Sequence, residues 1–353
     1  MAGRTPWATP FARWGVHRAW WDAYGESAHE QTLEVIDPSA PGDGPVAFVP
    51  LMHRHETEPG DDAARTELRH VAGLPLAPVE PTAMAVFFGA TYHADYATIL
   101  ADPARLPDVA DAVVDYLAAG DGTPDGAAWD AVDLRRLRCG DPAADALVEA
   151  FRARSARQRW TVTMEREDVC PVVTLPEGLD FDGFLGTLGK TERHEIRRKV
   201  RRAENAGDVR LEVAADPLAE LDGFIELHQK RWGERGLFPP TAGGDASRVF
   251  FRRLLEHLGP DGPFKLARLT VGGRTIAAGA HFDDGETLYY YNAGVDPDAR
   301  ELSPGVVLAA RYVQTAIELG RRRVDFLRGN ESYKYEWGAI DEPIQRILVT
   351  REA

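Results

Sequence analysis

The stretch "SPGVVLAARYVQTAIELG" (residues 303–320) decides the fold, because it predicts a long helix that begins sharply and is followed at once by a strand. Ser303 is a residue type that caps helices, and Pro304 suits the first turn, where its missing N–H is not needed. Gly305 leaves the first N–H groups open to another molecule. A bare helix start after a strand attracts anions through its dipole and free donors, so it is a candidate phosphate site. A plain capped helix explains the same residues.

The segment after this helix, "RRRVDFLRG" (residues 321–329), predicts a strand whose alternate side chains point to opposite sides. Asp325 falls in its middle. An aspartate there is costly unless it is paired. We therefore expect Asp325 to lie at a site or to pair with a neighbouring arginine.

Three strands precede the helix in a predicted meander: "PFKLARLTV", "TIAAGAHF" and "TLYYYNAGV", separated by the turns "GGR" and "DDGE". Helical patterns come before them at residues 189–207, 216–236 and 247–259, the first of them capped by Thr191. This order predicts a mixed α/β fold with flanking helices. The first half of the chain is a looser version of the same order. We therefore predict two related domains, residues 1–155 and 156–353.

The overall charge limits the classes of partner. The chain has 56 acidic and 41 basic side chains, a net charge of -15, which argues against general binding to DNA or to anionic membranes. No run of about 18 apolar residues occurs, which excludes a spanning helix. The two cysteines, Cys139 and Cys170, are far apart and form no metal-ligand spacing, and no Ser-His-Asp, zinc or Walker pattern is present. A reduced, cytoplasmic protein without a signal peptide or a metal is the expectation.

Basic residues gather between positions 190 and 202, where seven lysines and arginines lie on one predicted helix. One interpretation is a solvated surface helix. The other is a basic face, with Arg197 and Arg201, that meets the phosphates of a cofactor or of a tRNA acceptor arm.

Aromatic residues mark two further candidate surfaces. In "FIELHQKRW", Phe224, His228 and Trp232 share one helix face. His228 is either a general base, since its unperturbed pKa lies near 6.5, or a packing residue. In "LYYYNAG", Tyr289 and Tyr291 share one strand face, which either lines a cleft or packs in the core.

Taken together, "LSPGVVLAARYVQTAIELGRRRVDFLRGNESYKYEWGA", "YYYNAGVDP" and "FIELHQKRW" resemble the acetyltransferase domain of the cellulose-biosynthesis CelD-type proteins, a branch of the GNAT superfamily. The first half also resembles that family. The resemblance implies a tandem GNAT-like acyl-CoA N-acyltransferase fold, as in the Fem-type peptidyltransferases, which use aminoacyl-tRNA to extend peptidoglycan bridges. It implies acyl transfer from acetyl-CoA or another acyl-CoA to an amine or hydroxyl, in envelope or exopolysaccharide metabolism.

Two other functions stay open. In GNAT enzymes the donor pyrophosphate sits on a "Q/R-x-x-G-x-G/A" turn, and the matching place here is "RELSPGV", which keeps only Gly305. A Fem-like, aminoacyl-tRNA-dependent transferase acting on a peptidoglycan precursor is therefore the first alternative. A non-catalytic GNAT-fold binding module is the second. The acceptor is a small molecule or a cell-envelope component.

The resemblance also implies roles for particular residues. Lys334 matches a lysine near the C-terminus of Fem-type enzymes that faces the developing oxyanion. Tyr333 or Tyr335 would protonate the leaving thiolate, and Asp325 or His228 would receive the amine proton. The expected donor-binding positions are Arg300, Ser303, Gly305, Val306, Asn292 and Asn330. The expected substrate contacts are Tyr291, Arg231, Trp232, Arg197 and Arg201.

Overall fold

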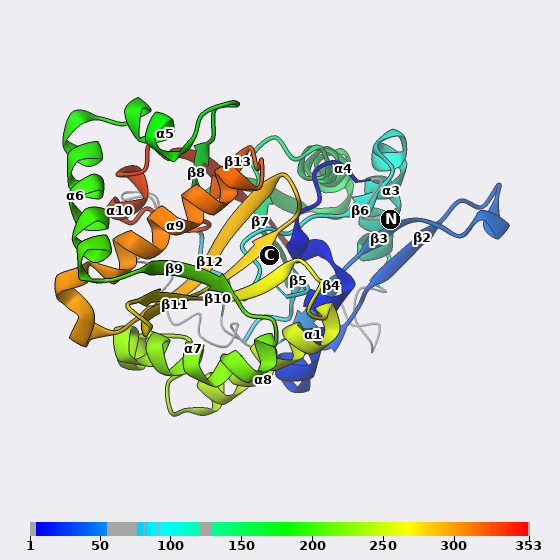
Figure 1. Ribbon diagram of the computed structural model, residues 1–353. Helices are drawn as coiled ribbons and strands as arrows, with labels where there is room; N and C mark the ends of the chain where they lie inside the picture. The colour runs from blue at the N-terminus through cyan, green and yellow to red at the C-terminus, as the bar shows by residue number, and fades with distance from the viewer. Residues whose placement is uncertain (1–4, 55–75, 81, 91, 121–128, 352–353) are drawn as a thin grey trace. The chain divides into compact units, whose positions relative to one another are not determined.

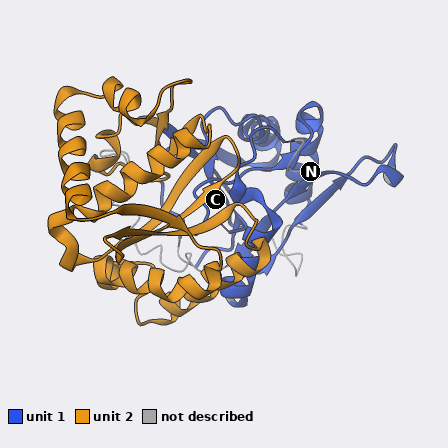
Figure 2. Cartoon of the chain, in the orientation of Figure 1, with its two compact units in different colours: residues 1–169, 342–353 blue, residues 170–341 orange. Residues whose placement is uncertain are grey.

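The computed structural model describes residues 5–54, 76–80, 82–90, 92–120 and 129–351. The chain divides into two compact units, Met1–Val169 with Glu342–Ala353, and Cys170–Asp341 (Figure 2). The boundary that we predicted, at 155/156, falls inside the helix α4 (Pro142–Gln158), whereas the units divide within the strand β8 (Trp160–Thr174). Most of the last strand, β14 (Ile340–Arg351), returns to unit 1, because it pairs with β7 (Ala131–Arg138). A degenerate GNAT-like character of unit 1 stays a prediction.

Unit 1 contains two sheets. The larger has the order β1-β4-β5-β7-β14, and the smaller has the order β2-β3-β6. Their remaining strands are β1 (His29–Glu30), β2 (Leu33–Ile36), β3 (Pro45–Val49), β4 (Leu51–Arg54), β5 (Ala85–Phe88) and β6 (Leu100–Ala101). The helices are α1 (Trp14–Tyr24), α3 (Leu106–Ala118) and α4 (Figure 1). Apolar side chains of α3 and α4 form one core cluster with β5, β7 and β14.

A buried ion cluster ties β14 to β7 in unit 1. Arg346 is fully buried, and its Nε and Nη2 atoms lie 2.5 and 2.8 Å from the two carboxylate oxygens of Asp133. Its Nη1 donates to Glu165 at 3.0 Å and to the Ala77 carbonyl at 2.7 Å. Burial opposes ionisation of Asp133, but Arg135 and Arg346 hold its pKa below the usual range.

Unit 2 contains the sheet order β8-β13-β12-β11-β10-β9, to which β8 contributes its last residues. The strands are β9 (Val209–Val213), β10 (Phe264–Val271), β11 (Arg274–Asp283), β12 (Thr287–Val295) and β13 (Arg323–Asp325). The helices are α5 (Phe181–Thr187), α6 (Lys190–Ala206), α7 (Pro217–Trp232), α8 (Ala242–Leu258), α9 (Pro304–Glu318) and the short α10 (Ser332–Tyr335). The strands β12 and β13 pair in parallel, and the neighbouring pairs β8–β13, β12–β11, β11–β10 and β10–β9 are antiparallel.

Helices cover both faces of this sheet (Figure 1). On one face, α6 and α9 pack on the sheet, with Val200 and Val313 in the same core cluster as Tyr290 of β12. On the other face lie α7 and α8, where Phe251 stacks on Tyr291 with ring centroids 5.8 Å apart. The predicted mixed α/β fold with flanking helices is confirmed.

Some predicted details of unit 2 are wrong. The strand predicted at 321–329 is only Arg323–Asp325, because Leu327 has a left-handed backbone, φ 58°, which ends the extended run. Helix α6 has Gly189, not Thr191, at its N-cap position. Helix α8 begins at Ala242, with the Thr241 hydroxyl accepting from the Gly244 N–H, five residues before the predicted start.

Within the part of the chain that the structure describes, no helix is long and apolar enough to cross a membrane. No group of three or more histidine, cysteine and acidic side chains is placed there to hold a metal ion. Cys139 and Cys170 are not joined in a disulfide bond.

Candidate active site

The strands β12 and β13 run side by side for only three residues. Thr287, Leu288 and Tyr289 pair with residues 323–325, and the ladder then stops while β12 continues to Val295. The next N–H after β13, that of Phe326, donates to Pro171 on β8 instead. Residues 290–295 of β12 therefore lack β13 as a neighbour, and we call them the open edge. Asn292, one of the expected donor-binding positions, lies in this open edge.

A β-bulge shapes the open edge. Ala280 of β11 pairs with Asn292, and His281 pairs with Tyr290, so Tyr291 is an extra residue in β12. Tyr291 packs on α8, and the Asn292 side chain forms a hydrogen bond with His228 of α7. The bulge thus turns both of these predicted site residues toward α7 and α8, on the face opposite α9.

The end of α7 is attached to the open edge. The Trp232 indole N–H donates to the Ala293 carbonyl at 3.3 Å, and the Arg231 guanidinium lies 4.6 Å from the Trp232 ring. Gly294 is required, because a Cβ there would lie 2.2 Å from the backbone N of His228. Helix α7 therefore rests directly on the strand.

His228 is a weak base in this position. Its side chain is buried, and burial lowers its pKa to about 4, although the hydrogen bond with Asn292 opposes that shift. Its Nδ1 has no hydrogen-bond partner within the described residues, and a Cβ on Gly236 would lie 3.0 Å from that atom. The imidazole is neutral at pH 7, which makes it a packing residue with little capacity to take a proton.

The start of α9 differs from the predicted cap. Ser303 occupies the N-cap position with left-handed angles, φ 53° and ψ 53°, and its side chain makes no cap hydrogen bond. Its hydroxyl instead accepts from Arg202 Nη2 of α6 at 2.6 Å. The Ser303 carbonyl accepts from Val306 and Val307 at 3.0 and 3.1 Å, and Pro304 has no N–H. Gly305 therefore supplies the one backbone donor left in this first turn.

Space and charge remain at the start of α9. A Cβ on Gly305 would meet only a Val295 methyl group, at 3.9 Å. Arg300 is exposed just before it, and Arg202 reaches it from α6. Because its partner is a neutral hydroxyl, the charge of Arg202 is not cancelled there. Arg202 and Arg300 thus form a small positively charged site beside the open edge, and Gly305 leaves this site accessible.

The two tyrosines of α10 point in different directions. Tyr333 packs edge-on against Phe326 at 6.1 Å, and burial raises its pKa well above the usual value near 10. Tyr335 is 38% exposed and donates its O–H to Asp341 at 2.7 Å. The sequence could not separate them, because the choice depends on whether this segment is helix or strand. The helix turns Tyr333 inward.

Lys334, between these tyrosines, is buried with 2% exposure. Its Nζ lies 2.9 Å from each of the carbonyl oxygens of Leu327, Arg328 and Gly329. Asp325 is also buried, and its Oδ1 accepts from the Leu327 N–H at 2.7 Å. Both predicted groups are thus bound to the backbone of the loop that follows β13. Asn330, at the end of this loop, is exposed.

The basic face of α6 is partly neutralised. Arg197 pairs with Asp182 at 2.9 Å and Arg198 pairs with Glu195 at 2.7 Å. Arg197 and Arg201 line a cavity of about 410 Å³ between α5, α6 and α9, whose walls also carry Asp182 and three other acidic residues. Such a mixed surface is less suited to a polyanion than the sequence alone indicated.

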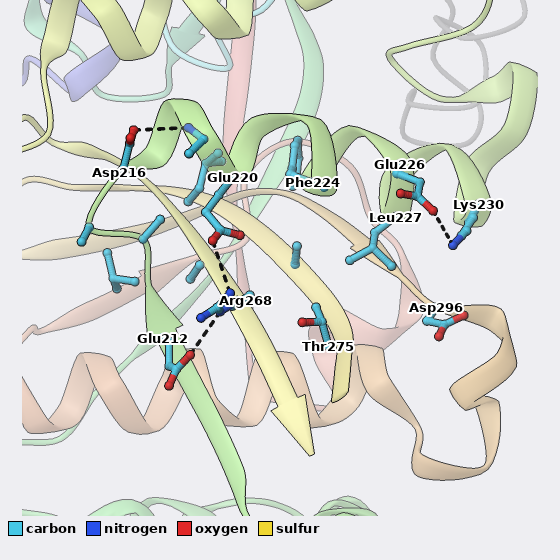
Figure 3. A pocket seen from close by; sticks show the side chains of 18 residues that line it. Glu212, Asp216, Glu220, Phe224, Glu226, Leu227, Lys230, Arg268, Thr275 and Asp296 are labelled. Atoms are coloured by element: carbon cyan, nitrogen blue, oxygen red, sulfur yellow. Dashed lines mark hydrogen bonds and ion pairs between the residues drawn. The ribbon is translucent and has the colours of Figure 1, made fainter. Parts of the chain in front are cut away.

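Sequence reasoning missed a groove of about 740 Å³ along the β9–β11 side of α7 (Figure 3). Small and apolar residues form its floor, and Glu212 and Glu220 share Arg268 at its rim. Its other charged lining residues are Asp216, Glu226, Lys230 and Asp296. The helical spacing of Asp216, Glu220 and Gly223, which line this groove, is the signal in the sequence that could have indicated it.

A known family model matches part of unit 2. Residues 190–335 match the family model described as "Acetyltransferase (GNAT) domain". All of them lie in unit 2, which therefore carries a GNAT-type acetyltransferase domain. No curated protein matches the chain by sequence.

Solved structures match over most of the chain. A crystal structure of FemX superposes with a TM-score of 0.57 at 12% identity, covering 93% of this chain and 90% of that one. A conserved protein of unknown function from Bacteroides thetaiotaomicron gives 0.56 at 11%, covering 96% and 90%. L-PGS from Bacillus licheniformis gives 0.50 at 12%, covering 95% and 90%. At these identities the likeness concerns the fold alone.

Proposed function

We propose that unit 2 is an acyltransferase that binds an acyl-CoA along the open edge of β12 and moves its acyl group to an amine or hydroxyl. The observation that carries the proposal is the parting of β12 and β13 beside the accessible start of α9. It lies inside the segment that matches a GNAT acetyltransferase domain. A strand edge that lacks a neighbouring strand can hold an extended donor by backbone hydrogen bonds, as in β-strand addition.

The proposed chemistry is direct attack. The acceptor nitrogen forms a bond to the donor carbonyl carbon, and the carbonyl oxygen becomes an oxyanion. When the C–S bond breaks, the thiolate takes a proton from Tyr333, which faces inward and stays protonated because burial raises its pKa. Asp325, whose buried carboxylate lies at the start of the loop that follows β13, remains our candidate for the proton lost by the acceptor.

The donor phosphates would lie at the start of α9. Arg202 and Arg300 supply positive charge there, and the Gly305 N–H supplies one backbone donor. Val306 follows in the first turn, with its N–H already bound to Ser303. Asn292 and Asn330 would contact the donor from either side of the parting strands.

One observation favours a second donor. A first turn with a single free backbone N–H is a weak pyrophosphate site, and the glycine pattern of coenzyme A binding is absent. A Fem-like transfer from aminoacyl-tRNA to a peptidoglycan precursor is therefore the alternative, with Arg201 on α6 as a phosphate contact. The acyl-CoA proposal includes two further points. The chain would belong to the CelD-type branch, and its acceptor would be a component of the cell envelope or an exopolysaccharide.

A donor screen tests both. The thermal midpoint is measured with acetyl-CoA, longer acyl-CoAs, free coenzyme A and aminoacyl-tRNA, since a ligand at 100 times its Kd stabilises a fold by about 2.7 kcal/mol. Acyl-CoA should raise the midpoint and release thiol when amines are added. Stabilisation by tRNA alone, lost steeply with salt, would favour the alternative because many phosphate contacts release counterions. No shift with any donor would indicate a binding module.

A further inference from the structure

The Lys334 ammonium is held by the backbone of a single loop. It has three N–H donors, and three successive carbonyl oxygens, those of Leu327, Arg328 and Gly329, each lie 2.9 Å from it. The Glu331 carboxylate lies at the same distance from Nζ. A buried ammonium must be paired, and these acceptors satisfy it. In this arrangement no N–H of Lys334 is left for an oxyanion. Another group must therefore stabilise the oxyanion, the role that the resemblance implied for Lys334.

The loop takes an unusual backbone shape to reach the ammonium. Successive carbonyls of a strand point to opposite sides, so three in a row cannot meet one atom unless the strand ends. Leu327 with φ 58° and Gly329 with φ 105° provide that change of direction. The Asp325 carboxylate fixes the entry by accepting the Leu327 N–H. At Gly329 the positive φ favours glycine, because L side chains rarely adopt it, and a Cβ there would also displace the Glu331 carboxylate, whose Oε2 would lie 2.7 Å away.

The geometry of the peptide bond then places the N–H groups. No cis peptide occurs among the described residues, and in a trans peptide the C=O and the following N–H point in opposite directions. With the carbonyls of Arg328 and Gly329 turned to Lys334, the N–H groups of Gly329 and Asn330 face away from it. Neither N–H has a hydrogen-bond acceptor within the residues that the structure places.

We propose that Lys334 is a positioning residue that aims the Gly329 and Asn330 N–H groups at the oxyanion formed in acyl transfer. This inference rests on the proposed function. As the acceptor nitrogen bonds to the acyl carbon, the carbonyl electron pair moves to oxygen and the two N–H groups donate to it. The C–S bond then breaks, and the thiolate takes the Tyr333 proton. Tyr333 precedes Lys334 and packs on Phe326 at the start of the same loop. The same loop therefore positions both the Tyr333 hydroxyl and the two N–H donors.

The first experiment removes the ammonium and keeps the aliphatic chain. Lys334→Met should lower kcat by ~10²–10³-fold, the scale of a lost oxyanion donor, with donor Kd changed less than about threefold. Lys334→Arg, which keeps a cation able to bind carbonyls, should recover part of that loss. The matched control is Lys265→Met, since Lys265 also binds a backbone carbonyl, that of Pro260, and lies on β10, two strands away from β12. A Lys334→Met enzyme with near-normal kcat, or a loss seen only in Kd, overturns the proposal.

A second experiment separates the N–H groups from the lysine. Lactic acid incorporated at position 330 replaces the N–H by an ester oxygen, and Asn330→Ala is its matched amide control. With Lys334 unchanged, the ester should lower kcat by ~10²-fold relative to Asn330→Ala. Equal rates for the ester and the amide overturn the oxyanion assignment. This comparison also decides the matter if Lys334→Met does not fold.

Hydrogen exchange gives a readout that needs no donor. The Leu327 N–H, bound to Asp325, should be protected in the wild type and should exchange faster in Lys334→Met than in Lys265→Met, because the loop loses its anchor. Unchanged protection would show that Lys334 does not hold the loop. If no acyl donor binds the wild type, the proposed function fails while this measurement still decides the anchoring.

Discussion

Removal of one hydroxyl, in Tyr333→Phe, tests the proposed chemistry directly. The Tyr333 ring packs on Phe326, and its hydroxyl makes no hydrogen bond among the residues described, so phenylalanine keeps the packing. Loss of the general acid should lower kcat by ~10²–10⁴-fold, which raises the barrier by about 3–5 kcal/mol. Thiol release from acetyl-CoA in single turnovers measures this step. The thermal midpoint should change by less than about 1 °C, since no partner is lost.

The pH profile provides a second measure of the same group. Burial raises the pKa of Tyr333, so its acid form persists above pH 10, where an ordinary tyrosine is half ionised. The wild-type rate should therefore not fall between pH 8 and 10 because of this residue. The control is Tyr335→Phe, which removes an exposed hydroxyl bound to Asp341 and should leave kcat unchanged. A normal rate for Tyr333→Phe, or equal losses in both variants, would refute the assignment.

Other substitutions probe the donor site and the two units. Arg202→Met should raise the Kd for acetyl-CoA about tenfold, the scale of one charge-assisted hydrogen bond, in calorimetric titrations; Arg198→Met, whose arginine is paired with a glutamate one turn away, should not. Arg346→Met leaves a buried carboxylate without its main partner, so unit 1 should lose about 3–5 kcal/mol in urea unfolding, and a loss below about 1 kcal/mol would contradict the buried ion cluster. Burial lowers the pKa values of His228 and His281 to about 4, below the 6.5 of the unfolded chain. Their contribution to stability is complete above pH 6.5 and is lost as the pH falls toward 4, by about 1.4 kcal/mol per pH unit for each histidine. The free energy of unfolding of unit 2, measured with urea from pH 7.5 to 5, should follow that slope. A free energy that does not change with pH would show that these side chains are hydrated.

Regular elements of unit 2 could be predicted from the sequence because their signals are local. The meander predicted at 263–271, 275–282 and 287–295 matches β10, β11 and β12 to within one or two residues. Its turns contain glycines with positive φ, Gly272, Gly273 and Gly285, which mark the reversals. The helix predicted at 303–320 is α9, whose apolar face is visible in the spacing of its residues.

Two of the misses, the cap of α9 and the length of β13, have a shared physical cause. Ser303 and Leu327 both adopt positive φ without being glycine, and no residue pattern announces that conformation. The cap predicted from the identity of Ser303 therefore fails, and so does the strand predicted through Leu327. The partners of Lys334 are backbone carbonyls, which carry no side-chain signal, so the resemblance singled out Lys334 but could not indicate which groups it binds.

The start of α9 distinguishes donor classes by its chemistry. An ordinary helix offers four free N–H groups to a phosphate. Here Pro304 has none, and those of Ser303, Val306 and Val307 are bound to backbone carbonyls, which leaves Gly305. A pyrophosphate held here must depend mainly on Arg202 and its exposed neighbours. Salt screens exposed charges, so such binding weakens as ionic strength rises, even for a small donor. A salt effect by itself therefore does not identify tRNA. A steep dependence of the binding constant on salt concentration, caused by the release of many counterions, would indicate tRNA, whereas acyl-CoA held by two arginines should show a shallow dependence.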